Sequence, residues 1–499
     1  MNKSRVCWVL PIVLASTGAA WAADTEIRVY GGVDVSVDYF DNGLKSLPAI
    51  SSNNSYVGFG GSTTFSPAWQ AVAQIEGQAD ISATPSVKDT FGFRNSFVGF
   101  VNKNWGSIKA GKNDTPYKSS TGAWDPFANT IGDYNSIFSN TGGDSRVEFE
   151  VRAAHAIWYE SPNLGPFQFN LMWSPGQNLA GDNSDFPLGD NTCSGGTFGS
   201  SGSGNPGTQN NFGSTGNSSA VAAGQANGVN QPHANNGGVG SNVLGTSSIG
   251  SGFGECTDGA FGDLYSGSVI FKQGNFIAIA AAELHRAVNR LSDVVPVSGI
   301  PNDLLAVTTT SSGQPISGLV TARNEWAAKV GAGYDFGVVK VYAAYEFMRR
   351  TNMPDDFNER SRDGVYASIT WRATEKDDIS FSYNHAFATP GNPLINSTVN
   401  FNAVTPPQGL LCPQTADPAT NASNHNDDAA DQYSAGIRHY FSPAVSVYAV
   451  GSYMHNHPCG HFTLGAGGHG IVAAQRNQFN ETFPGKDLAG LSVGTTFRF

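Results

Sequence analysis

The chain has 499 residues, of which 60 are glycine, 14% are charged and 11% are aromatic. Its formal net charge is −12 and its mean hydropathy is −0.23. The acidic balance argues against a nucleic-acid partner. The hydropathy is too low for a bundle of membrane-spanning helices, and no segment reaches the roughly 18 apolar residues that such a helix needs.

The N-terminus has the three parts of a secretory signal peptide. Lys3 and Arg5 form a basic end, residues 6–15 are mostly apolar, and residues 20–22 fit a small-residue cleavage site. We therefore expect residues 1–22 to be removed. A transmembrane helix is the alternative, but the apolar run is too short to span a bilayer. Losing two basic residues takes the net charge of the mature chain from −12 to −14.

Apolar and polar residues then alternate in segment after segment. This period of two residues is typical of a strand with one apolar and one polar face. The last segment is typical: Leu491, Val493 and Phe497 alternate with small or polar residues, and the chain ends on Phe499. The pattern predicts sixteen strands, in the ranges 27–39, 53–66, 69–81, 91–102, 105–112, 152–161, 166–174, 263–272, 275–286, 325–336, 338–350, 364–373, 378–388, 432–441, 444–455 and 489–499.

Short turns and long connections alternate between these strands. The long connections are 41–52, 82–90, 113–151, 175–262, 287–324, 351–363, 389–431 and 456–488. Outer-membrane barrels have short periplasmic turns and long external loops, whereas a soluble sandwich has no reason to place every long connection at one end. We therefore expect an all-β fold, a sixteen-strand antiparallel transmembrane barrel, with residues 23–499 as a single domain.

The connection 175–262 is rich in glycine, serine and asparagine, so it cannot bury enough apolar surface to fold by itself. We expect a long external loop there; a separate extracellular domain is the alternative. Four cysteines remain after the leader, and an even number in an exported chain suggests disulfides. Proximity favours pairing Cys193 with Cys256 and Cys412 with Cys459, but three pairings exist and four free thiols are a further alternative.

Two motifs resemble the trimeric porins of Gram-negative bacteria, of the β-proteobacterial type. Residues 94–100 read RNSFVGF and continue in WGSIKAGKNDTP at 105–116, while residues 156–167 read AIWYESPNLGPF. The start of the first strand and the terminal Phe499 also fit this family. The chain departs from the family in its length, in Lys112, which stands where arginine is commoner, and in its cysteines.

The resemblance implies a homotrimer in the outer membrane, with the third loop, 113–151, folded into the lumen as a constriction. Acidic residues of this loop would face basic residues of the wall and so create a transverse field that selects ions. The loop acids are Asp114, Asp125, Asp133 and Asp144, and the wall bases are Arg28, Arg94 and Lys109. With the net charge of −14, the pattern predicts a weak cation preference.

Outward residues should contact lipid and lipopolysaccharide. Aromatic residues near the strand ends are typical of the girdles of such barrels; they are Tyr39, Phe40, Trp105, Trp158, Tyr159, Trp371, Tyr440 and Phe441. The small, smooth seam of Val33, Val35, Leu491 and Val493 is expected at the trimer contact by analogy with the family. Phe499 is expected to be the signal for the outer-membrane assembly machinery.

Features of the sequence also allow functions other than a general diffusion pore. His455, His457, Cys459 and His461 have a spacing that could bind zinc or copper, although a disulfide at Cys459 would remove one ligand. No G-x-S-x-G element or triad spacing supports an enzyme, and we expect no cofactor and no metal. A substrate-specific channel, or a barrel whose 175–262 loop acts as an adhesin or receptor, remains the alternative.

Overall fold

The computed structural model describes residues 25–41, 46–82, 91–140, 149–175, 263–288, 294–295, 300–301, 323–351, 360–390, 427–460, 462–469 and 485–499. The expected leader and residues 176–262 of the expected long loop lie outside these ranges. Nowhere in the described ranges is there a helix long and apolar enough to cross a membrane.

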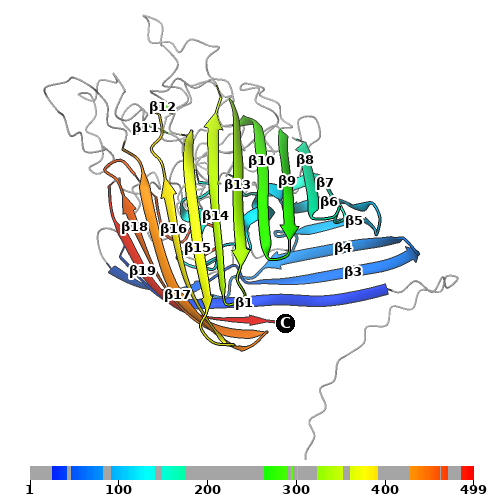
Figure 1. Cartoon of the computed structure of the whole chain (residues 1–499), viewed down its shortest axis with the longest axis horizontal. Coiled ribbons are helices and arrows are strands. Elements are labelled where there is room, and N and C mark those ends of the chain that lie inside the picture. Colours follow the sequence, from blue (N-terminus) through cyan, green and yellow to red (C-terminus); the bar gives the residue numbers. More distant parts are fainter. Residues whose placement is uncertain are drawn as a thin grey trace, which may run out of the picture.

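The described chain is almost entirely β-structure (Figure 1). One short helix, α1 (Pro116–Thr121), and one 3-10 turn, η1 (Tyr134–Ser136), interrupt the strands. The strands are β1 (Thr25–Asp41), β2 (Ser46–Ser52), β3 (Tyr56–Ser66), β4 (Trp69–Gln78), β5 (Ser96–Asn102), β6 (Gly106–Asp114), β7 (Arg152–Glu160), β8 (Phe167–Pro175), β9 (Asp263–Gln273), β10 (Phe276–Val288), β11 (Val294–Val295), β12 (Ile300–Pro301), β13 (Arg323–Asp335), β14 (Val339–Arg350), β15 (Arg362–Arg372), β16 (Asp377–Ala386), β17 (Ala430–Ser442), β18 (Val445–Asn456) and β19 (Leu488–Arg498).

The sheet is closed into a barrel, because β1 pairs antiparallel with β19 from Gly32↔Arg498 to Asp41↔Ala489. The blue first strand and the red last strand approach each other at this seam in Figure 1. The backbone of Phe499 also exchanges two hydrogen bonds with Gly31, at 3.0 and 3.1 Å. A Cβ on Gly31 would lie 2.7 Å from Cζ of Phe499, so the glycine makes room for the terminal ring.

The sheet contains 17 strands, but β2 and β3 lie end to end against β1. Together they form the second barrel strand, with a break at residues 53–55 where Asn54 has a φ of 55°. Sixteen strands therefore cross the barrel, as predicted. The expected loop 41–52 is wrong in extent, since residues 46–52 continue the sheet by pairing with the end of β1.

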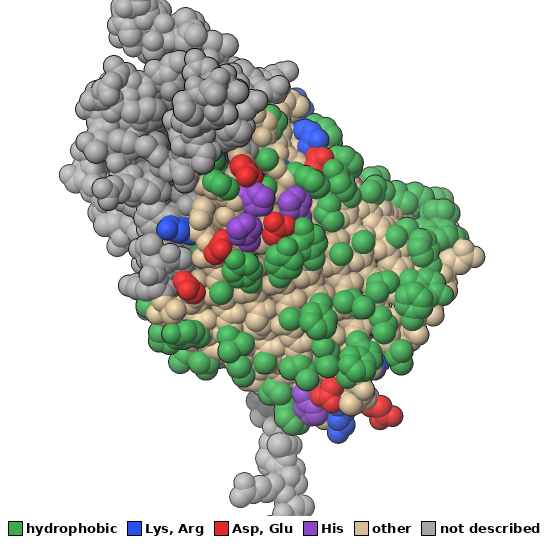
Figure 2. All heavy atoms as spheres, turned by 60° about the vertical axis from the view of Figure 1, so that its left-hand side comes forward, with side chains coloured by type: hydrophobic (Ala, Val, Ile, Leu, Met, Phe, Trp, Pro, Cys, Tyr) green, Lys and Arg blue, Asp and Glu red, His purple; other side chains and the backbone are tan. Residues whose placement is uncertain are grey.

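Alternate side chains point to opposite faces along each strand. In β19, Leu491 and Val493 are exposed on the outside, whereas Ser492 and Thr496 are buried on the inside. Exposed apolar side chains are distributed over the outer surface (Figure 2). The barrel thus has an apolar outer face and a polar inner face, the arrangement that a bilayer around a water-filled lumen requires.

Most of the expected girdle lies on the outer face: Tyr39, Trp105, Trp371 and Phe441 are exposed there. Tyr440 is exposed to the lumen instead, where it lines a pocket with Trp124 and Arg438. Phe40 and Trp158 are corrections, because they are only 3% exposed and point inward. Strand parity explains this, since Phe40 shares a face with the buried Asp38. Its ring joins an apolar cluster inside the barrel that also contains Ile131 and Leu464.

Candidate functional site

The connection after β6 turns into the barrel instead of away from it. The side chain of Thr115 accepts a hydrogen bond from the backbone N–H of Lys118 at 3.3 Å, and Pro116 occupies the first helical turn, so α1 begins at once. Residues 115–140, which we call the inward segment, then continue through turns and η1. Tyr117, Trp124, Ile131 and Phe138 are buried.

The inner wall binds the backbone of the inward segment. Arg362 of β15 donates to the carbonyl of Ile137 at 2.8 Å, and Asn384 of β16 donates to that of Tyr134 at 2.5 Å. Further donors come from neighbouring positions of the wall: Ser368 and Tyr366 to Trp124 at 2.9 and 3.1 Å, Ser434 to Gly132 at 3.3 Å, and Gln432 to Asp133 at 3.4 Å. Buried carbonyls need such partners, so these bonds determine where the segment lies.

A buried ion pair fixes the start of the inward segment to β13. Nζ of Lys329 pairs with Glu150, and neither side chain is exposed to solvent. Lys329 also donates to Oγ1 of Thr121 at 2.6 Å and lies 4.1 Å from the ring centroid of Tyr117. Glu150 accepts hydrogen bonds from Tyr134 Oη at 2.7 and 2.8 Å.

Glu346 of β14 makes a second anchor. Its carboxylate accepts from the hydroxyl of Tyr117 at 2.5 Å and from the backbone N–H of Ser139 at 2.7 Å. Both ends of the segment are thereby attached to one wall residue. Burial, with the charge of Glu346 as the second cause, raises the pKa of Tyr117 well above its ordinary value.

Two of the four expected filter acids are buried inside the segment. Asp125 accepts from the backbone N–H groups of Phe127 and Tyr134 at 2.9 and 3.0 Å. Asp133 caps η1 by accepting from Asn135 and Asn129 at 2.9 and 2.7 Å. Burial raises the pKa of Asp125 to about 7 and raises that of Asp133 well above its ordinary value.

Asp114 lies at the end of β6 in a network of basic groups. Its carboxylate is 3.1 Å from the guanidinium of Arg152 and 3.3 Å from the ammonium of Lys118, and it accepts from Asn95 at 3.1 Å. Asp144 lies outside the described residues. None of the three described acids therefore presents an unpaired, unburied carboxylate to the lumen.

The three expected wall bases all lie on the inner face, in different surroundings. Nζ of Lys109 is 2.7 Å from Glu160. Arg94 pairs with Glu76 at 3.5 Å and lies 4.7 Å from the ring centroid of Tyr56. Arg28 is exposed, with its guanidinium carbon 5.5 Å from the ring centroid of Tyr30.

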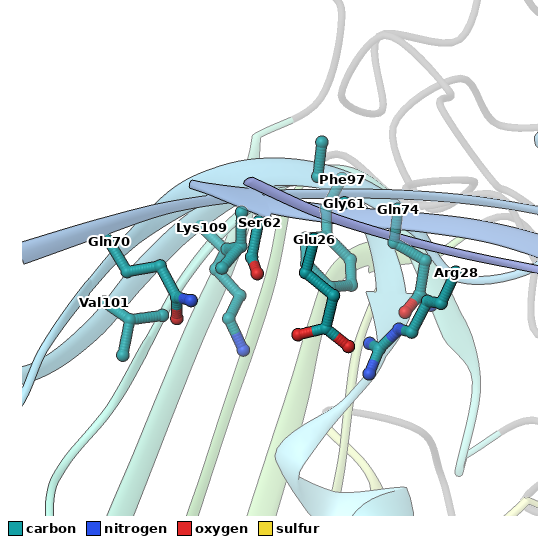
Figure 3. Close-up of a pocket in the computed structure, with 11 residues that line it drawn as sticks. Glu26, Arg28, Gly61, Ser62, Gln70, Gln74, Phe97, Val101 and Lys109 are labelled. Atoms are coloured by element: carbon teal, nitrogen blue, oxygen red, sulfur yellow. The ribbon is translucent and has the colours of Figure 1, made fainter. Parts of the chain in front are cut away.

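The structure brings Arg28 and Lys109 to one cavity of about 280 Å³, and Arg94 is not part of it. Figure 3 shows Glu26 and Arg28 of β1 and Lys109 of β6 reaching into this space from different parts of the wall. Polar side chains of Ser62, Gln70 and Gln74 complete the lining. The cavity is a water-accessible polar surface that carries both signs of charge.

Sequence reasoning missed Arg152, Lys118 and the Lys329–Glu150 pair. Arg152 begins β7 on its inward face, and Lys118 follows Asp114 at the i,i+4 spacing of a helical ion pair. Both signals were present in the sequence. Nothing local identifies Lys329 as a partner of Glu150, because 179 residues separate the two.

The expected cysteine pairs are only partly within the described ranges. Cys459 is disulfide-bonded, whereas Cys193, Cys256 and Cys412 lie outside these ranges. A bonded Cys459 offers no thiolate, and no group of three metal-ligating side chains converges among the described residues. The Nδ1 atoms of His455 and His457 instead lie 2.9 and 2.8 Å from Asp487 and Asp427.

Those histidines belong to a patch of histidine and acidic side chains on the outer surface, which Figure 2 shows near one end of the barrel. His385 joins the patch through Asp431, at 2.9 Å. The hydroxyls of Tyr383 and Tyr453 donate to Asp431 and Asp487 at 2.7 Å each. The patch is a hydrogen-bonded cluster of polar side chains that lies beside exposed hydrophobic side chains of the outer surface (Figure 2).

Comparison with known proteins agrees with this architecture. The chain is similar to the anion-selective porin from Comamonas acidovorans, with a TM-score of 0.59 and 14% identity over 95% of this chain and 100% of that one. This likeness concerns the fold. An outer membrane porin protein of Bordetella pertussis is 25% identical over 182 residues, which cover 32% of this chain and 46% of that relative.

The family comparison covers far more of the chain. The model of the Gram-negative porins matches residues 10–457. Its match agrees with the closed sixteen-strand barrel, the apolar outer face and the polar wall described above. The chain is therefore a member of the Gram-negative porin family and a protein of the outer membrane.

Proposed function

We propose that this porin forms a water-filled channel for the passive diffusion of ions and small hydrophilic solutes. The observation that carries the proposal is the inward segment, whose backbone is bound by the polar inner wall from Glu346 to Ser434. A segment held in this way narrows a lumen without closing it by a hydrophobic plug. Chemistry on the solute is not part of the proposal.

We propose a weakly selective channel, because each of the three wall bases lies near an acidic residue. Lys109 faces Glu160, Arg94 faces Glu76, and Arg28 shares its cavity with Glu26. The weak cation preference inferred from the net charge would then come from loop carboxylates and not from Asp125 or Asp133, which are buried. Analogy with the family also supports a homotrimer that contacts lipid and lipopolysaccharide and is inserted by the assembly machinery.

The test is single-channel recording in planar bilayers, with reversal potentials in a salt gradient. Deleting residues 122–139 should raise the conductance, because the water column widens; an unchanged conductance would contradict a constricting role. Glu26→Gln and Arg28→Gln form a matched pair that should shift the reversal potential in opposite directions. If the reversal potential of the unaltered protein lay near the value for a channel that passes only one of the two ions, weak selectivity would be contradicted.

A further inference from the structure

A second part of the external connections also lies inside the barrel. Residues 462–469, which we call the cap segment, belong to the connection between β18 and β19. Phe462, Thr463, Leu464 and Ala466 are at most 3% exposed. An ordinary external loop runs over the surface, where water satisfies its backbone. Burial of these residues indicates a fixed position.

The beginning of the cap segment is tied to the wall by an amide. The side chain of Asn456, at the end of β18, accepts from the backbone N–H of Phe462 at 2.8 Å and donates to its carbonyl at 2.9 Å. The same amide donates to the carbonyl of Lys486 at 2.7 Å, so one side chain holds both limbs of the connection.

Arg362 of β15 joins the cap segment to the inward segment. Its guanidinium carbon lies 4.2 Å from the ring centroid of Phe462, while a terminal nitrogen donates to the carbonyl of Ile137 at 2.8 Å. Leu464 packs in one buried apolar cluster with residues of both the inward segment and the wall. That cluster includes Phe40, Phe127, Ile131, Ile137, Met454, Phe462, Leu464 and Leu488.

Two glycines bring the cap segment against the backbone of the inward segment. A Cβ on Gly467, whose φ is +96°, would lie 2.8 Å from Cβ of Asn135 and 2.8 Å from Oδ1 of Asp133. A Cβ on Gly468 would lie 2.1 Å from Oδ1 and 3.2 Å from Cα of Asn129. A larger residue fits at Gly468 only if the side chain of Asn129 leaves its hydrogen bond with Asn54 or if the two segments move apart.

The far end of the cap segment reaches β1. The ring of His469 packs edge-on against Phe40, with centroids 5.7 Å apart, and its Nε2 lies 3.4 Å from Oδ1 of Asp38. Asp38 also accepts from Ser51 and Ser492 at 2.5 and 2.6 Å, so the carboxylate is fixed on the wall.

We propose that the cap segment is a second element that narrows the lumen. It blocks the part of the lumen next to the wall from β15 to β1, and it fixes the inward segment in its position. Five strand steps separate β15 from β1, about 24 Å along the wall. Phe462 contacts Arg362 of β15 and His469 contacts Asp38 of β1, so the two ends of the cap segment touch the two ends of this arc. Solutes are thereby directed to the remaining wall, where Lys109 of β6 lies.

The inference rests on the proposed channel, and the test separates the two. Variants are compared with the unaltered protein by single-channel conductance and by liposome swelling with sugars of increasing size. Deleting residues 462–469 should raise the conductance and admit larger sugars. Gly468→Val should do the same without shortening the chain, because its side chain displaces the cap segment from Asn129. Gly274→Asn is the matched control, since nothing lies within 4 Å of that turn glycine.

Each outcome decides one of the two proposals. An unaltered protein that forms no channel would overturn the proposed function. A conducting protein in which the deletion and Gly468→Val both leave the conductance and the sugar cut-off unchanged would overturn the cap segment alone. If the deletion variant does not fold into a barrel, the result for Gly468→Val decides. That variant must then show the same heat-dependent change of mobility on gels as the Gly274→Asn control, which indicates a folded barrel.

Discussion

Replacing Lys329 by methionine tests whether the buried ion pair holds the inward segment in place. The change leaves the carboxylate of Glu150 buried without its counter-charge, although Tyr134 and Thr121 still donate to it. Breaking one partner of such a pair costs about 3–5 kcal/mol. At about 1.36 kcal/mol per factor of ten, the population with the segment released should rise by roughly two to four powers of ten.

Trypsin cleavage after Lys118 measures that population, because proteolysis follows the fraction of open molecules when opening is fast. The cleavage rate in the Lys329→Met variant should rise accordingly, and adding Glu150→Gln should recover much of the loss, since the amide needs no counter-charge. Lys109→Met is the control, because its pair with Glu160 is partly exposed and such pairs are worth at most about 1 kcal/mol. Equal effects of Lys329→Met and Lys109→Met would refute the reasoning.

Two further predictions concern pH and backbone geometry. Burial raises the pKa of Asp125 from 3.8 to about 7, so the stability that its protonated form contributes is complete below pH 3.8 and is lost as the pH rises towards 7. The rate of trypsin cleavage after Lys118 should therefore increase over that pH range. The increase should be much smaller when Asp125 and Asp133, whose pKa is also raised, are both replaced by asparagine. Gly106 has a φ of +86°, and a Cβ there would lie 2.1 Å from the carbonyl oxygen of Glu160. Gly106→Ala should therefore lower the temperature at which the barrel unfolds, as measured on gels. Gly165→Ala should lower this temperature less, because nothing lies within 4 Å of a Cβ there, and equal shifts would contradict the prediction.

The barrel could be predicted because the period of two survives along almost every strand. The seam is an example, because the alternation at Leu491 and Val493 gives the outward face directly, and both residues are exposed there. The errors arose where clustering was preferred to parity. Phe40 is aromatic and lies near a strand end, as a girdle residue would, but it follows the outward Tyr39, and successive residues of a strand point to opposite faces.

The candidate site was harder to predict. An acidic side chain is expected to be exposed to solvent, but it can be buried where backbone N–H groups nearby donate hydrogen bonds to it. Asp125 precedes a proline and Asp133 precedes a 3-10 turn, and both are positions where a carboxylate accepts from its own backbone. That local signal could have been read. The cap segment could not have been found, since the sequence of residues 465–468 resembles a flexible loop and its burial depends on residues of β1, β15 and the inward segment.

The contacts of the inward segment suggest that the wall, more than the segment, determines the width of the channel. Arg362, Asn384 and Ser434 bind main-chain carbonyls, which are present whatever the side chain at those positions. The segment can therefore change its side chains and keep its path, provided that the small and apolar residues facing the wall still fit. A wall donor that is lost leaves a buried carbonyl without a partner, at a cost of about 1–3 kcal/mol. Since the donors lie on neighbouring strands of a rigid sheet, their spacing is fixed by the barrel, and the position of the segment follows from it.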